Sequence, residues 1–202
     1  VAIYQRDHAT ARASSEEGVA LYRELGESHG AAVALHNLAY VDLREGDLPA
    51  ARAHYEQALA LLGPTGDQRH IGHTLLGLAD VDARQGNLEG ARERFREGFA
   101  CLQPLGGGRE VAYGLEQLAG WVLTQGEAER AARWMGAAEA LRERIGSPPL
   151  PAEAEEYEAL RARMVELLGG QRSTEAWAAG RAGGDDRAVA EVLDWLGSWK
   201  IS

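Results

Sequence analysis

The chain has 202 residues, a formal net charge of −10 and a pI of about 5.1. A field of this sign repels a phosphate backbone, so we expect no direct binding of nucleic acid by this segment. Abundant Ala, Leu, Glu and Arg favour helix over strand. The single cysteine, Cys101, excludes an internal disulfide. Together with the absence of a signal peptide it suits a cytoplasmic location, and no apolar stretch approaches the roughly 20 residues of a membrane span.

A repeat of 40 residues organises the chain, and its copies are marked by small residues. One glycine series is Gly46, Gly86 and Gly126. A second glycine series and an alanine series have the same step: Gly26, Gly66, Gly106, Gly146, Ala11, Ala51, Ala91 and Ala131. We expect a partial copy over 1–30 and copies over 31–70, 71–110 and 111–146. The partial copy suggests that the sequence is a fragment of a longer protein.

Each copy is predicted to be a helical hairpin. In the copy over 31–70, helical spacing of Leu35, Leu38 and Ala39 gives the first helix one apolar face. Gly46 ends this helix, because glycine adopts the left-handed conformation at little cost. Asp47 then caps the second helix, as Asn87 does in the next copy, whereas Glu127 is a poor cap. The second helix is expected to bury Ala51, Tyr55, Ala58 and Leu62 and to end before Gly66.

The small residues have a packing role, and with the aromatic position they resemble the tetratricopeptide repeat (TPR). Ala39 and Ala51 lie where the two helices cross, and a larger side chain would separate them. Tyr55, Phe95 and Met135 occupy the matching space between hairpins. The family pattern recurs as Leu75, Leu78, Ala79, Ala91, Phe95 and Gly98, and as Leu115, Leu118, Ala119, Ala131, Met135 and Ala138. The resemblance implies an all-α, right-handed superhelix of stacked hairpins, although the usual TPR has about 34 residues.

Residues 147–202 follow the repeats and are predicted to cap them. Prolines between Ser147 and Pro151 interrupt the helix, and a new helix is expected from about residue 152 to Leu168. Ser173 is predicted to cap a short helix that carries Trp177, and Asp185 or Asp186 to begin the last one. These three helices would cover the open end of the stack. Trp195 and Trp199 either complete this core or contact a neighbouring domain.

The C-terminal stretch from Ala131 to about residue 196 resembles the end of large bacterial regulators. These proteins join a nucleotide-binding ATPase domain to a helical-repeat domain, and some add a LuxR-type or SARP-type DNA-binding domain. The resemblance implies a sensor or partner-binding module. The chain itself contains no GxxxxGK[ST] phosphate-binding motif.

In the TPR fold the first helix of each hairpin lines a concave groove, and its non-core positions are our candidate binding residues. Besides Val33, Leu43, Leu76, Gly120 and Thr124, the groove is expected to present His36, Tyr40, Arg44, His73, Asp80, Arg84, Tyr113 and Glu116. Arginine binds carboxylates through a fork of donors, and tyrosine adds a rigid contact surface. The sequence therefore predicts a protein or peptide partner. A small polar ligand and self-association are the alternatives.

Candidates for chemistry have simpler explanations. His36, His73 and Asp80 offer metal-ligand types, but no ligand spacing such as HExxH supports a metal site. Cys101 occupies the repeat position that is Leu21, Leu61 and Leu141 in the other copies, which favours a core position. Glycines 106–108 follow a helix, which favours a turn over a phosphate loop. Glutamates 153–158 suit the start of a helix. We therefore expect no catalytic residues, no metal and no cofactor.

Overall fold

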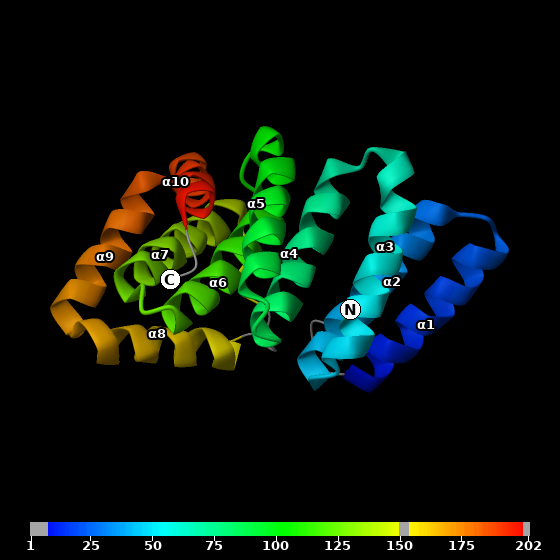
Figure 1. Ribbon diagram of the computed structural model, residues 1–202, viewed down its shortest axis with the longest axis horizontal. Helices are drawn as coiled ribbons and strands as arrows, with labels where there is room; N and C mark the ends of the chain where they lie inside the picture. Colours follow the sequence, from blue (N-terminus) through cyan, green and yellow to red (C-terminus); the bar gives the residue numbers. More distant parts are fainter. Residues whose placement is uncertain (1–7, 150–153, 200–202) are drawn as a thin grey trace. The chain divides into compact units, whose positions relative to one another are not determined.

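The computed structural model describes residues 8–149 and 154–199, and the segments of secondary structure among them are all helical (Figure 1). The chain divides into two compact units, residues 1–101 and 102–202. The first contains α1 (His8–Glu24), α2 (Ser28–Glu45), α3 (Leu48–Leu62), α4 (Gln68–Arg84) and nearly all of α5 (Leu88–Leu102). The second contains α6 (Arg109–Thr124), α7 (Ala128–Ile145), α8 (Ala154–Leu168), α9 (Gly170–Gly183) and α10 (Asp185–Ser198). The all-α, TPR-like fold is confirmed, and the expected boundary at residue 146 falls inside the second unit.

Left-handed glycines end the helices where the repeat predicts them. Gly46 has φ 84°, and the amide of Asp47 then donates to the carbonyl of Asp42 at 2.9 Å. The Asp47 carboxylate accepts the amide of Ala50, so it caps α3 as expected. Glu127, the predicted poor cap, makes no side-chain capping bond at the start of α7. Positive φ recurs along the chain at Gly26, Gly66, Gly86, Gly106, Gly126 and Gly146, and Gly106 combines it with an extended ψ of 175°.

The predicted small and aromatic core positions are buried. Tyr55, Phe95 and Met135 have no exposed surface, and neither do Ala39 and Ala51. These contacts let the helices of a hairpin approach closely and fill the space beside them. The core positions of the TPR pattern therefore account for the packing within each unit.

Two leucines that we expected on the groove lie in the core instead, so this part of the prediction is wrong. Leu43 is 1% exposed and packs in a cluster with Ala39 and Tyr55. Leu76 is fully buried, and an ideal Cβ built on Gly98 would lie only 2.9 Å from its Cδ2. The missing side chain at residue 98 thus provides the space for Leu76.

Helices α8, α9 and α10 cover the last hairpin within the second unit. Helix α9 packs closely along α7, because Gly136 and Gly180 bring the two backbones together; an ideal Cβ on either would overlap a carbonyl oxygen of the other helix. Ser173 was predicted to cap α9, which is wrong: α9 already begins at Gly170, and Ser173 is buried within it. Glycines 169 and 170 do end α8, but they do not delay the next helix.

A cluster of tryptophans closes the core of the second unit. Trp195 of α10 is 9% exposed, and its ring lies 5.9 Å from that of Trp121 and 5.5 Å from that of Trp134. Trp199 contacts Trp121 at 5.4 Å, and the guanidinium of Arg130 lies over the Trp195 ring at 5.3 Å. Trp195 therefore completes the core of its own unit, which was one of the two alternatives for this residue.

Candidate partner-binding surface

Six of the eight predicted binding residues lie in the first unit, on α2 and α4. We call them the inner row: His36, Tyr40, Arg44, His73, Asp80 and Arg84. At one end His36 is buried, and its Nδ1 is 3.1 Å from the Thr74 hydroxyl. The rings of His36 and His73 lie 4.2 Å apart between centroids. His36 and His73, which belong to neighbouring hairpins, are therefore in contact.

The other end of the inner row carries charge. Arg84 donates from Nε and Nη2 to both oxygens of Asp80, at 2.9 and 3.1 Å. The Asp80 side chain is 10% exposed, whereas Arg84 keeps a third of its side chain in solvent. The Asp80–Arg84 pair and the half-buried Arg44 therefore make this end of the row the charged one.

Tyr55 lies beneath this charged end. Burial raises the pKa of the Tyr55 hydroxyl well above its ordinary value; the charges of Asp80 and Tyr40 raise it further, and Arg84 opposes them. These electrostatic effects place Tyr40, Asp80 and Arg84 near one buried phenol. The inner row thus brings aromatic, cationic and hydrogen-bonding groups together on α2 and α4.

The two predicted residues of the second unit are largely enclosed. Tyr113 is 7% exposed. Glu116 accepts two hydrogen bonds from Arg142, at 2.6 and 2.7 Å, and Arg142 itself is 4% exposed. Glu116 also borders a cavity of about 320 Å³ between α6 and α8, together with Gly120 and Tyr157. The carboxylate predicted to face a groove is therefore part of a buried ion pair.

Sequence reasoning missed two buried carboxylates that join neighbouring helices of the first unit. Asp42, 1% exposed, accepts from Arg12 of α1 and bonds to His54 of α3, both at 2.6 Å. A similar set of side-chain hydrogen bonds surrounds Asp82, one repeat later, and Asp82 is fully buried. Its donors are Arg52, Arg94 and Asn87, at 2.5, 2.5 and 2.9 Å. The 40-residue spacing of Asp42 and Asp82 is the signal that could have revealed them.

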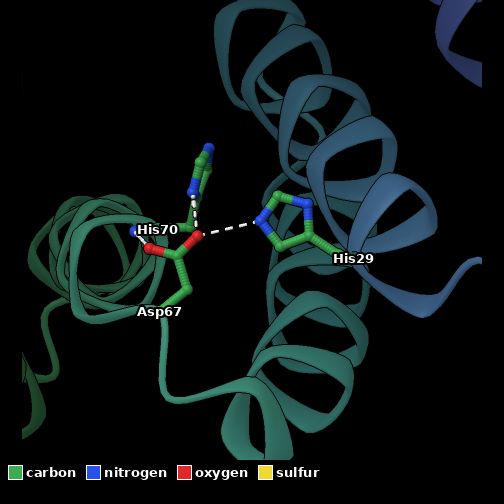
Figure 2. Close-up of side chains that lie close together, drawn as sticks. All are labelled: His29, Asp67 and His70. Carbon is green, nitrogen blue, oxygen red and sulfur yellow. Dashed lines mark hydrogen bonds and ion pairs between the residues drawn. The ribbon is translucent and has the colours of Figure 1, made fainter.

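A second cluster missed by the sequence analysis joins the first turns of α2 and α4. Figure 2 shows the Asp67 carboxylate between the rings of His29 and His70. Its Oδ2 lies 2.8 Å from His29 Nε2 and 2.6 Å from His70 Nδ1. Burial raises the pKa of Asp67, but the hydrogen bonds from His29, from the His70 amide and from the His70 ring outweigh it and lower this pKa.

The cluster has the donor types of a metal site. Among the described residues it is the group of three His, Cys, Asp or Glu side chains whose ligand atoms come within 4.8 Å of one another. His36, His73 and Asp80, which we had considered from the sequence, do not form such a group there. Asp80 instead pairs with Arg84.

Comparison with known proteins gives one family match. Residues 1–191 match a family model described as the MalT-like TPR region. The match spans both units and most of the C-terminal helices. A comparison with curated proteins gives no match. Among the described residues, no helix is long and apolar enough to cross a membrane.

Proposed function

Because the chain belongs to the MalT-like TPR family, we propose that it is the partner-binding module of a larger bacterial signalling or transcriptional regulator and performs no catalysis itself. The observation that carries this proposal is the inner row on α2 and α4, where two contacting histidines, a tyrosine and two arginines lie on helices of neighbouring hairpins. A TPR-like array offers its inner helices for recognition, and this row supplies the necessary side chains.

The chemistry of the row favours an acidic peptide segment. Arginine guanidinium groups bind carboxylates through paired hydrogen bonds, and Arg84 already shows this mode with Asp80. The Arg84 side chain is one-third exposed, and a guanidinium carries five N–H donors. The half-buried Tyr40 and His73 would add flat contact surface beside the cations.

Quantitative capture tests this proposal. The tagged chain is used to recover interacting proteins from cells that express the whole regulator, and the double variant Arg44→Ala, Arg84→Ala is compared with the unmodified chain. We expect the variant to lose most of the specifically recovered partner. The matched control is Arg23→Ala, Arg96→Ala, which removes the same charge from exposed positions on α1 and α5. Equal recovery by all three chains would overturn the assignment of the inner row.

A small-molecule sensor is the second candidate, and the cavity between α6 and α8 favours it. Its volume of about 320 Å³ lies within the range of small-ligand sites, and Glu116 and Tyr157 supply polar groups at its edge. A ligand there would act by changing how α8 packs on the hairpin. Native mass spectrometry of the chain purified from its host tests this: a bound metabolite, lost in Tyr157→Ala, supports a sensor, whereas an unmodified mass removes it.

A further inference from the structure

We propose that His29, Asp67 and His70 bind a divalent transition-metal ion of the zinc type, which links the first turns of α2 and α4. The three side chains already meet at one point: Asp67 Oδ2 is 2.8 Å from His29 Nε2 and 2.6 Å from His70 Nδ1 (Figure 2). Two imidazole nitrogens and one carboxylate oxygen are ligands that zinc commonly takes in proteins.

The cluster is specific to this step of the repeat. Positions equivalent to Asp67 in the other copies are Glu27, Gly107 and Ser147, and those equivalent to His29 are Arg69, Arg109 and Pro149. No other copy can therefore assemble two imidazoles and a carboxylate at these positions. The capping and packing positions that recur along the repeat therefore do not account for the two histidines.

The structure orients the carboxylate in advance. Asp67 Oδ1 accepts the amide of His70 at 3.2 Å and so caps α4, which leaves Oδ2 directed at the rings. The amide of Asp67 in turn donates to the Thr65 hydroxyl, which donates to the carbonyl of Leu62. Fixed outer partners of this kind hold metal ligands in position and are part of functional metal sites.

Only small movements separate the present arrangement from a coordination sphere. All three ligand atoms lie within 4.8 Å of one another, and a tetrahedral zinc ion with bonds of about 2.0–2.2 Å places its ligand atoms roughly 3.3 Å apart. His29 and His70 are 49% and 35% exposed, so their rings are free to turn by this amount and solvent reaches the site. Each neutral imidazole binds the metal once its proton occupies the other ring nitrogen.

The donor set also selects the ion. Imidazole favours zinc, copper and nickel, whereas magnesium and calcium prefer oxygen ligands alone. The positive ends of α2 and α4 oppose a cation, and the Asp67 carboxylate and the chain's net charge of −10 offset them. Three protein ligands leave the fourth zinc position to water or to a ligand atom of a partner. Because α2 and α4 also carry the inner row, the ion would fix the spacing of that surface.

Titration calorimetry of the tag-free whole chain with zinc sulfate tests the site. We expect one zinc ion per chain, and affinity lowered roughly tenfold or more in each of His29→Gln, His70→Gln and Asp67→Asn. Asparagine keeps the cap of α4, so Asp67→Asn separates the loss of a ligand from the loss of a helix start. His8→Gln and Cys101→Ser, which change possible ligands outside the cluster, should bind zinc as the unmodified chain does.

Absorption spectroscopy with Co²⁺ is an independent test, because it does not rely on the heat of binding. The unmodified chain should give the visible d–d absorption of Co²⁺ in a low-coordinate site, and His29→Gln should abolish it while its circular dichroism stays unchanged. Absence of zinc binding in the unmodified chain, or equal affinity in the three cluster variants and the controls, would overturn the proposal. Loss of binding only in Cys101→Ser would overturn it as well. None of these outcomes depends on whether the inner row binds a peptide.

Discussion

Removal of the Asp82 carboxylate should destabilise the first unit by about 3 kcal/mol, because this group holds three helices together. Asp82 of α4 is fully buried and accepts from Arg52 of α3 and Arg94 of α5, both at 2.5 Å, and from Asn87 in the turn between α4 and α5. In Asp82→Ala the two guanidinium groups keep their charge and lose their common acceptor.

The size of this loss depends on how deeply the carboxylate and its two guanidinium partners are buried. Loss of one partner of a buried ion pair costs about 3–5 kcal/mol when the remaining charge stays without water. The side chains of Arg52 and Arg94 are 26% and 28% exposed, so both regain part of their hydration in the variant. Charge-assisted hydrogen bonds contribute about 1.5–3 kcal/mol each, and this solvation reduces their sum. A total near 3 kcal/mol is therefore expected.

Urea unfolding followed by circular dichroism measures this loss. All five tryptophans lie in the second unit, so tryptophan fluorescence, recorded in parallel, follows that unit alone. Glu93→Ala, which removes an exposed carboxylate from α5, is the control and should change the free energy of unfolding by less than about 0.5 kcal/mol. A double-mutant cycle of Asp82→Ala with Arg94→Met should show coupling above about 1 kcal/mol. A loss under about 0.5 kcal/mol in Asp82→Ala would refute the assigned role.

Three further predictions concern single positions. Gly180→Ala should lower the free energy of unfolding by about 2 kcal/mol or more, because the new methyl group would overlap the Arg133 carbonyl. Thermal unfolding measures this loss, and Gly197→Ala, where the added methyl group meets no neighbouring atom, is the control. Burial raises the pKa of Tyr157 above its ordinary value of 10, so the unfolded chain loses this proton first and stability should fall as the pH rises above 10. Tyr157→Phe should reduce that alkaline loss in unfolding titrations, and an unchanged pH profile would contradict the assignment. Burial also raises the pKa of the Cys101 thiol, so iodoacetamide should modify it more slowly at pH 8 than in the urea-unfolded chain; equal rates would show an accessible thiolate.

The fold could be predicted because its determinants are local. A glycine at position 46 and an aspartate at position 47 end one helix and start the next through contacts within a few residues. The small residues at 39 and 51 require only that two consecutive helices cross. The contact of His36 with His73 likewise joins the first helices of two consecutive copies.

The lateral register between hairpins could not be predicted from the period alone. His29 meets Asp67, and His36 meets Thr74, across 38 residues, whereas Arg52 meets Asp82 across 30. A period of 40 shows which positions are equivalent but not which of them touch. The sequence analysis therefore missed the metal-type cluster.

Polarity gave a wrong guide to burial at several positions. Asp42 and Asp82 are charged yet lie inside, because basic side chains from adjacent helices reach them. The equivalent position in the next copy is Val122, which is buried without any such partner. Leu43 was assigned to the surface because its helical phase suggested a groove, yet it packs beside Tyr55. Burial at these positions depends on neighbouring helices, which a single helix pattern does not reveal.

The regular spacing of the left-handed glycines constrains how this protein can change in length during evolution or in the laboratory. From Gly26 to Gly146 one follows another every 20 residues, each with positive φ. One residue inserted within a helix turns every later side chain of that helix by about 100° and removes its small residues from the crossing point. Insertion of a whole hairpin, in contrast, leaves the helical phase of every other helix unchanged. Duplication of residues 47–86, which begins at one helix cap and ends at the next equivalent glycine, is therefore the natural way to lengthen the array.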